Sequence, residues 1–167
     1  MDKLVAHFQQ QGFTPKQPCQ ARRRISVSEK GQTYVLELPE PKKSAVYQVD
    51  GYMITAGDKC DAFVAIEAGQ PNHSSKGAVV QIFVELKGKN VSHGIKQLRQ
   101  TITHGLFESV KPMDPNPRYA RLIPKSIPSS AAKSCVENAR REFRDKYNVR
   151  LTTLKSKQPD KLSLNND

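Results

Sequence analysis

Two charged residues close an otherwise apolar segment near the middle of the chain. Glu85 and Lys87 belong to the run IFVELK at residues 82–87, whose other side chains are all hydrophobic. Side chains two residues apart on a strand point to the same face, so this carboxylate and this ammonium group are expected side by side, with Cα atoms about 7 Å apart. Charge is costly among apolar neighbours unless the site has a use for it, which makes the pair a candidate for chemistry.

A second carboxylate is expected opposite Glu85. Residues 61–67 (DAFVAIE) and 78–87 (AVVQIFVELK) are dense in β-branched and aromatic residues, and a polar loop with Gly, Pro and Asn separates them. The simplest arrangement is an antiparallel hairpin centred on His73. In that register Asp61 lies directly opposite Glu85, with Cβ atoms about 5 Å apart. The register is assumed, and a slip by one residue would break the pairing.

Two carboxylates this close repel each other unless a proton or a cation lies between them. Oxygen ligands from Asp61 and Glu85 suit Mg²⁺, with Mn²⁺ as a substitute, and the backbone carbonyl of Leu86 is a reasonable extra ligand. Such a metal ion would polarise a phosphodiester and lower the pKa of a bound water. Lys87 could orient that water or stabilise charge in the transition state. The residues therefore indicate metal-dependent hydrolysis of phosphodiester bonds.

These segments also carry a resemblance. KCDAFVAI and QIFVELKGKNVSHGIKQL are similar to the PD-(D/E)xK nuclease superfamily, which has the restriction-endonuclease-like fold, over roughly residues 46–125. The grouping looks like that of small bacterial and phage-related proteins. The resemblance implies a central mixed sheet with a helix on each face, a divalent metal bound by Asp61 and Glu85, and Lys87 as the catalytic lysine. It also implies a polar residue from the following helix, which falls on Gln97. Thr101 stands where the RecB-like subgroup carries a tyrosine.

Each assignment has a simpler alternative. Asp61 could be a solvated carboxylate at a strand start, and Glu85 with Lys87 could be a charged pair that deters edge-to-edge association. Gln97 could equally be an ordinary exposed helix residue. The Glu-x-Lys spacing alone is not specific, because residues 40–42 repeat it in a segment interrupted by proline. The specific feature is its combination with a strand-start Asp, a hairpin and a helix that carries Gln.

Other polar residues are weaker candidates. Three basic residues after the Glu-x-Lys strand would make phosphate contacts or merely a solvated helix face: Lys89, Lys96 and Arg99. Two further basic clusters are secondary candidates: Arg22, Arg23 and Arg24, and Arg140, Arg141 and Arg144. Candidates for an additional carboxylate are Glu37, Glu40, Asp50 and Asp58, of which the two aspartates are more often turn residues.

The elements that must position these residues follow from hydrophobic periodicity. Before Asp61 we expect a helix over 2–11, strands over 22–29 and 32–40, and a third strand over 45–55. A turn at Lys30-Gly31 would join the first two strands, and Pro39 and Pro41 would end the second.

The second half of the chain shows two amphipathic helices. The first is expected to run from Asn90 or Ser92 to about Phe107, and the second to open at Ser129 or Ser130. Residues 118–123 are expected to form a strand, and 149–154 an edge strand. The order predicts an α/β fold, more narrowly an α+β mixed sheet flanked by helices.

Length and composition set the outer bounds. The 167 residues are expected to form one domain over 1–155, followed by a polar, disordered tail over 156–167. Three widely spaced cysteines fit neither a disulfide framework nor a zinc site. The N-terminus does not have the pattern of a signal peptide, and no apolar run is long enough to cross a bilayer, so we expect a cytoplasmic protein.

The charge of the chain points to a polyanionic partner. Its net charge is +11 and its isoelectric point about 9.7. Nucleic acid is the commonest such partner, whereas the absence of tryptophan is unfavourable for a membrane-surface helix. The favoured function is therefore a Mg²⁺-dependent endonuclease acting on DNA rather than RNA, with a homodimer left open. The alternatives are a catalytically inactive nuclease-like module that binds nucleic acid or protein, and an RNA-processing enzyme with the same site.

Overall fold

The computed structural model describes residues 1–68, 78–87, 90–113, 118–125 and 130–162, without the side chain of Lys87. The strands are β1 (Gln17–Glu29), β2 (Gln32–Gln48), β3 (Ala62–Glu67), β4 (Val79–Lys87), β5 (Arg118–Pro124), β6 (Val149–Thr153) and β7 (Pro159–Lys161). The helices are α1 (Asp2–Gln10), α2 (Val91–Ile102), α3 (Gly105–Val110), α4 (Ser130–Tyr147) and the short 3₁₀ helix η1 (Lys111–Met113).

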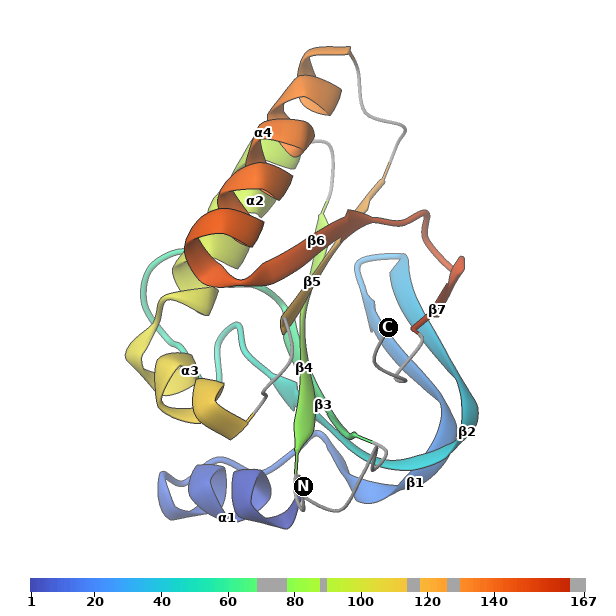
Figure 1. The fold of residues 1–167 in the computed structure, drawn as a ribbon, viewed down its shortest axis with the longest axis vertical. Helices are drawn as coiled ribbons and strands as arrows, with labels where there is room; N and C mark the ends of the chain where they lie inside the picture. The colour runs from blue at the N-terminus through green and yellow to red at the C-terminus, as the bar shows by residue number, and fades with distance from the viewer. Residues whose placement is uncertain (69–77, 88–89, 114–117, 126–129, 163–167) are drawn as a thin grey trace.

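The strands form one mixed sheet of seven strands (Figure 1). The order is β1-β2-β3-β4-β5-β6, and β7 pairs with β2. The pairs β1–β2, β2–β3 and β3–β4 are antiparallel, whereas β4–β5, β5–β6 and β2–β7 are parallel. The expected fold class, a mixed sheet flanked by helices, is confirmed.

The β3–β4 hairpin has the register that symmetry about His73 predicts, although His73 itself lies outside the described residues. Ala62 pairs with Val84, Phe63 with Phe83, and Glu67 with Val79. Both strands are almost wholly buried, which explains why they read as continuous apolar runs rather than as alternating ones.

The β1–β2 hairpin is longer than expected. Its turn is at Lys30 (φ 46°) and Gly31 (φ 79°), as predicted, and two successive left-handed residues are typical of a type I′ turn. The predicted end of the second strand at Pro39 and Pro41 is wrong, because β2 continues to Gln48. The register of the ladder shifts opposite Arg23, so the prolines lie at an irregularity where their missing N–H groups are tolerated.

The predicted third strand over 45–55 is also wrong. Residues 45–48 are the end of β2, and the chain then turns at Gly51, whose φ is 74°. Residue propensities alone do not distinguish a bulge in the middle of β2 from the end of a strand. The sequence therefore predicts two strands where the structure has one.

The helix expected to reach Phe107 is two helices. Asn90 caps the first by accepting a hydrogen bond from the His93 N–H at 3.0 Å. The helix ends at Ile102, and His104 takes an extended conformation and caps α3. The apolar stripe continues through Phe107, which is fully buried, so periodicity gives no sign of the break. The other two helices, α1 and α4, agree with expectation; residue 129 lies outside the described part, and α4 begins at Ser130.

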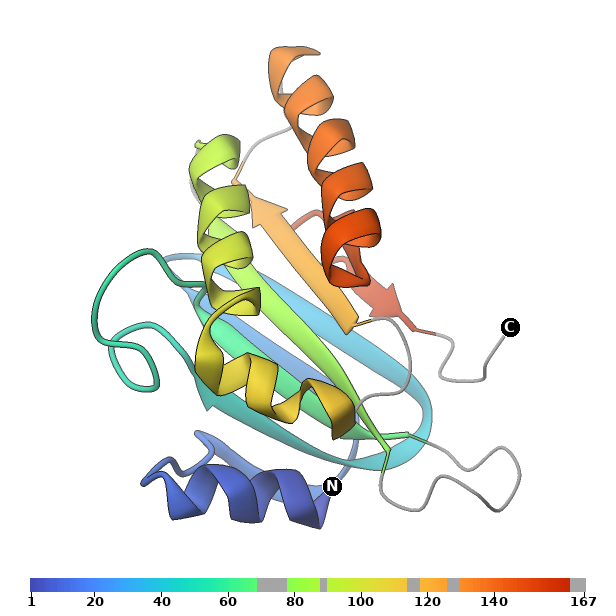
Figure 2. The same cartoon turned by 60° about the vertical axis from the view of Figure 1, so that its left-hand side comes forward.

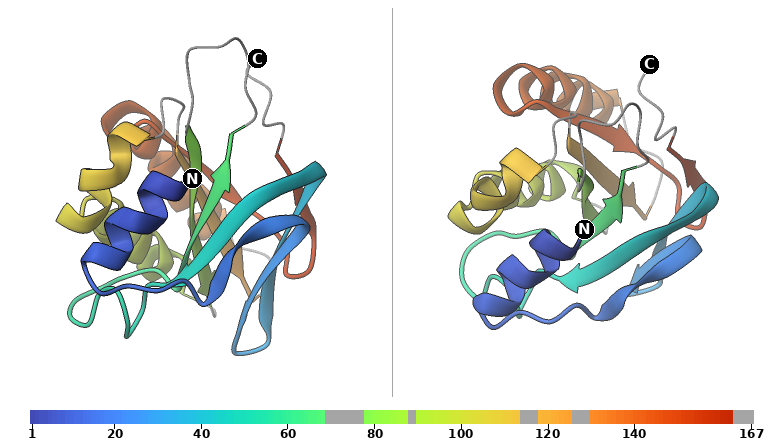
Figure 3. Two further views of the ribbon diagram at one scale, coloured as in Figure 1. Left: turned by 90° about the horizontal axis from the view of Figure 1, so that it is seen from below. Right: turned by 60° about the horizontal axis from the view of Figure 1, so that its bottom comes forward.

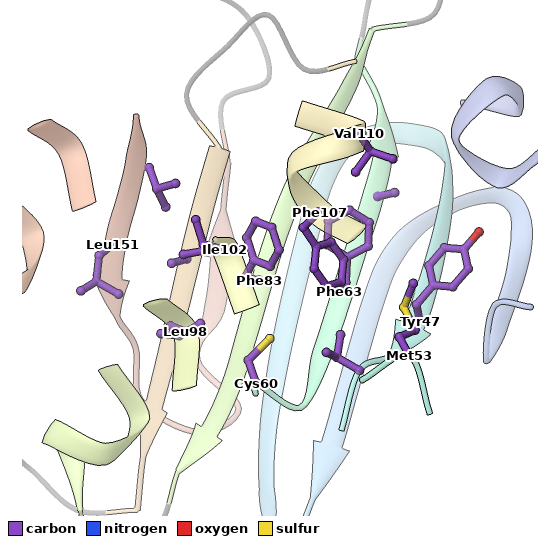
Figure 4. Close-up of a cluster of buried hydrophobic side chains, with 14 of the residues drawn as sticks. Tyr47, Met53, Cys60, Phe63, Phe83, Leu98, Ile102, Phe107, Val110 and Leu151 are labelled. Carbon is purple, nitrogen blue, oxygen red and sulfur yellow. The ribbon is translucent and has the colours of Figure 1, made fainter. Parts of the chain in front are cut away.

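The two faces of the sheet are covered in different ways. All four helices contribute to one core cluster, which includes Leu4, Phe8, Phe63, Phe83, Leu98, Ile102, Phe107, Val136 and Phe143 (Figure 4). Figures 2 and 3 show the helices gathered on this face, while β1 and β2 curl over the other. The second cluster is built from strand residues and Leu162, and includes Ile25, Tyr34, Leu36, Val64, Ile82 and Ile123. The resemblance implies a helix on each face of the sheet. Within the described residues this expectation is wrong, because the helices contribute only to the first cluster.

The C-terminal segment departs from expectation. Residues 156–162 were expected to belong to a disordered tail, but residues 159–161 form β7 beside β2. Asp160 is buried there and accepts hydrogen bonds from Arg121 at 2.5 Å and from Tyr34 at 2.9 Å. The sequence gives no sign of this order, because Asp160 is a polar residue whose partners, Arg121 and Tyr34, lie far away in the sequence. Residues 163–167 lie outside the described part.

No helix in the described ranges is both long and apolar enough to cross a membrane.

Candidate functional site

Asp61 lies immediately before β3 and completes the β3–β4 ladder with its side chain. Its N–H donates to the carbonyl of Val84 at 3.1 Å, and its own carbonyl accepts from the N–H of Val49 at 3.0 Å. Its carboxylate oxygen Oδ2 accepts a hydrogen bond from the backbone N–H of Leu86 at 2.6 Å. The carboxylate is therefore held at the backbone between Glu85 and Lys87, the two residues with which the sequence groups it.

Glu85 lies on β4 next to Leu122 of β5, and its side chain is only 1% exposed. Burial raises the pKa of the neighbouring Cys60 thiol well above its ordinary value, and the negative charges of Glu85 and Asp61 raise it further. Both carboxyl groups thus lie within electrostatic reach of one buried thiol. Asp61 and Glu85 lie at the same end of the hairpin, but the paired register ends at Ala62 and Val84, and Asp61 bonds to Val84 and Leu86 on either side of Glu85.

Lys87 is placed only by its backbone, which pairs with Pro124 at the end of β4. Its side chain lies outside the described residues, and so does Lys89. For Leu86 the structure gives both the main chain and the side chain. Its N–H donates to the Asp61 carboxylate, and its side chain packs into the second cluster, on the hairpin-covered face, which is the face of the sheet over which β1 and β2 curl.

Glu29 is a carboxylate of this region that the sequence analysis missed. Partial burial opposes its charged form, but hydrogen bonds with Asp61 and Lys30, together with the charges of Lys30 and Lys16, lower its pKa below the ordinary value. Glu29 ends β1, far from Asp61 in sequence, so only the curl of the β1–β2 hairpin brings the two together.

A hollow of about 340 Å³ opens beside this carboxyl pair. Its lining includes three acidic residues, Glu29, Asp50 and Asp61, together with Lys16 and uncharged residues of β1 and β2. Asp50, which sequence alone favoured as a turn residue, does line the hollow, and its carboxylate lies 3.4 Å from the ammonium group of Lys59. We call this region the acidic hollow.

Helix α2 fixes the backbone that leads into Asp61. The Gln97 side-chain amide donates to the carbonyl of Lys59 at 2.9 Å. The Thr101 hydroxyl accepts from the N–H of Cys60 at 2.8 Å and donates to the carbonyl of Gln97 at 2.9 Å. The Gln100 side chain accepts from the N–H of Asp58 at 3.1 Å. The Gln97 side chain thus binds the main chain at Lys59, two residues before Asp61, and Thr101 binds it at Cys60.

Two predicted phosphate contacts have partners inside the chain. Lys96 lies 2.7 Å from the carboxylate of Asp58, an ion pair that belongs to the same attachment of residues 58–60 to α2. Arg99 donates two hydrogen bonds, at 3.0 and 2.7 Å, to Glu142 of α4. A phosphate contact by either residue stays a prediction.

The donor set allows a simple test of whether a metal ion would fit. Within the described ranges no three His, Cys, Asp or Glu side chains are grouped so that they could hold a metal ion. The set that is present consists of Asp61, which is hydrogen-bonded to Glu29, and Glu85, which lies with Asp61 near the Cys60 thiol. Such a set suits Mg²⁺, which takes one or two protein carboxylates and keeps several waters.

Comparisons of the chain with protein-family models, with curated proteins and with solved structures give no match.

Proposed function

We propose that this protein is a metal-dependent nuclease that hydrolyses phosphodiester bonds in nucleic acid, with DNA the favoured substrate. The observation that carries the proposal is that the Asp61 carboxylate accepts a hydrogen bond from the Leu86 N–H, directly after Glu85 on β4, and is hydrogen-bonded to Glu29. The likeness of this hairpin and the following helix to the PD-(D/E)xK superfamily supports the same assignment.

The charge distribution supports a catalytic rather than a purely binding role. The chain has a net charge of +11, yet one of its hollows is lined by three carboxylates. A module that only holds a polyanion gains nothing from carboxylates turned toward it, because they repel phosphate. Carboxylates become useful when a divalent cation lies between them and the phosphate.

Each residue has a distinct part in the proposal. Asp61 and Glu85 hold Mg²⁺, with Mn²⁺ as a substitute and the carbonyl of Leu86 as an extra ligand. The bound metal supplies Lewis acidity toward a phosphate oxygen and toward water. The Leu86 N–H keeps one oxygen of Asp61 in place, and Gln97 and Thr101 fix the main chain before it. Lys87 assists the attacking water.

Two alternatives use the same residues. An inactive nuclease-like module would bind nucleic acid or a protein without cutting, and an RNA-processing enzyme would cut RNA at this site. The hydrogen-bonded carboxyl pair argues against the first alternative. The second differs only in substrate, so the same assay separates it.

The test is cleavage by the full chain of single-stranded, double-stranded and branched DNA and of RNA, with Mg²⁺, Mn²⁺ or EDTA. We expect cleavage that needs the metal, and its loss in Glu85→Gln and Lys87→Ala with nucleic-acid affinity changed by less than about fivefold. Asp61→Asn gives an independent variant, because Glu85 is buried and its replacement could affect folding.

The matched control is Glu67→Gln, the same chemical change at the opposite end of β3. It should leave cleavage unchanged, and circular dichroism should show that every variant is folded. Failure to cleave any substrate with either metal, or equal cleavage by wild type and Glu85→Gln, would overturn the proposal.

A further inference from the structure

A second hollow, of about 730 Å³, lies at the ends of β5 and β6. Ten residues line it: Gly31, Gln32, Pro124, Lys125, Thr153, Leu154, Lys155, Ser156, Lys157 and Gln158. Three of them are lysines, all exposed, and none is acidic. We call it the lysine groove.

The lysine groove lies at the same edge of the sheet as the candidate site. Pro124 in its wall is the register partner of Lys87, so their Cα atoms are about 5 Å apart. Because β4, β5 and β6 run parallel, their carboxyl ends meet at this edge, which is where ligands bind in open α/β sheets.

Residues at the turn of the β1–β2 hairpin line both hollows. Glu29, on one side of the turn, lines the acidic hollow, whereas Gly31 and Gln32 line the lysine groove. An extended polyanion lying along the groove would therefore reach the carboxylates within the width of a hairpin turn.

The chemistry of the groove is that of a phosphate contact. None of the three ammonium groups forms an ion pair with another residue in the described part of the chain. No aromatic side chain lines the groove, so it offers no surface on which bases could stack. Its lysines would contact the sugar–phosphate backbone and would not read the sequence.

The backbone that carries the lysines is anchored. The N–H of Lys157 donates to the carbonyl of Thr33 at 2.8 Å, and the hydroxyl of Ser156 accepts from the N–H of Thr33 at 3.0 Å. These bonds attach the segment after β6 to the start of β2. The main chain that carries Lys155 and Lys157 is thus attached to the sheet, and Lys125 directly follows β5.

A second basic groove among the described residues is a poorer choice. A groove of about 520 Å³ between α4 and β6 carries Arg140, Arg141, Arg144 and Arg150, but Glu137 also lines it. Arg140 is paired with Glu137, and Arg144 with Asp145. Half of its positive charge is therefore compensated by carboxylates of the same helix.

We propose that the lysine groove binds the phosphodiester backbone of duplex nucleic acid and presents it to the acidic hollow. The proposal rests on the proposed function for the claim that this ligand is the substrate, but the binding itself requires no cleavage.

The test measures binding of the full chain, in EDTA, to a labelled DNA duplex, an RNA duplex of the same sequence, and the corresponding single DNA strand. The variants are Lys125→Ala/Lys155→Ala and Lys157→Asn; asparagine is chosen because Lys157 has a φ of 65°, which asparagine tolerates. We expect the double variant to weaken duplex binding about tenfold at moderate salt. The slope of log affinity against log salt should fall by about 2, since each lost phosphate contact removes about 0.9.

The control is Lys3→Ala, which removes one lysine charge from an exposed site on α1, far from the hairpin turn in Figure 1. It should change neither the affinity nor the salt slope. The groove proposal is overturned if the double variant matches this control, if wild type binds no duplex, or if it binds the single strand more tightly. Comparing the DNA and RNA duplexes identifies which backbone the groove takes.

Different results would refute the nuclease proposal and the groove proposal. Duplex binding through the lysines without cleavage would refute the nuclease and keep the groove. Cleavage whose KM is unaffected by the double variant would keep the nuclease and refute the groove.

Discussion

The carboxylate of Asp61 has two kinds of neighbour, and both restrict what it can do. The Leu86 N–H fixes one oxygen at 2.6 Å, and Glu29 is hydrogen-bonded to the same side chain. These contacts hold the carboxylate in one position at the edge of the acidic hollow, where a cation could bind it.

At the same scale, the Arg99–Glu142 pair gives a prediction about pH. Hydrogen bonding from Arg99 lowers the pKa of Glu142 below its ordinary value of 4.5, against a smaller opposing effect of burial. A lowered folded-state pKa contributes stability above the unfolded pKa, and this contribution is lost as the pH falls through the folded pKa. We expect Glu142→Gln to lower the free energy of unfolding by about 1 kcal/mol near pH 7, and by much less near pH 3.

Urea unfolding at the two pH values measures this difference. Glu137→Gln is the control, because its pair with Arg140 is on an exposed surface of the same helix and should contribute little. A loss of stability in Glu142→Gln that is equal at both pH values would contradict the assignment.

At the scale of elements, the attachment of residues 58–60 to α2 decides where Asp61 stands. Thr101 is fully buried, and its hydroxyl is the acceptor for the N–H of Cys60. Thr101→Val keeps the shape but leaves that buried N–H without its acceptor, which costs about 1–3 kcal/mol. If Thr101 is a positioning residue, kcat should fall at least tenfold with little change in KM, and Thr101→Ser should restore it.

Steady-state cleavage kinetics and thermal unfolding together check this prediction. Thr103→Val is the control, since that hydroxyl bonds only to exposed carbonyls at the end of α2. Full activity in a destabilised Thr101→Val protein would show that the contact serves stability alone.

Elements also show what the sequence could and could not predict. The β3–β4 hairpin is predictable because two apolar runs and the polar loop between them fix its register from Ala62–Val84 to Glu67–Val79, and with it the end of the hairpin at which Asp61 and Glu85 lie. The bulge that carries β2 past Pro39 and the break before α3 are set by tertiary packing, which local propensity does not record. Glu29 was missed for the same reason: its place depends on a curl of the sheet.

At the scale of the whole molecule, a buried polar network ties the end of the described chain to the sheet. Asp160 of β7 bonds to Arg121 of β5 and to Tyr34 of β2, and all three are nearly or fully buried. Asp160→Asn removes the charge that compensates Arg121, and breaking a buried ion pair in this way costs about 3–5 kcal/mol. We expect a loss of that size in the free energy of unfolding, measured with chemical denaturant.

Tyr34→Phe is a milder variant, because it removes one hydrogen bond and should cost about 1 kcal/mol. Asp145→Asn is the control, since its pair with Arg144 is fully exposed on α4. A change below about 0.5 kcal/mol in Asp160→Asn would mean that the network does not hold β7 in place.

The Tyr34–Asp160 contact also bears on how fast the molecule can form. The two residues are 126 positions apart, so the contact closes a loop that spans most of the chain. Contacts of such long range must first pay the entropy of loop closure, and proteins rich in them fold slowly. The hairpin-covered face of the sheet is thus expected to be completed late in folding. Until then Tyr34, Leu36 and the exposed ladder of β2 are open to pairing with other chains.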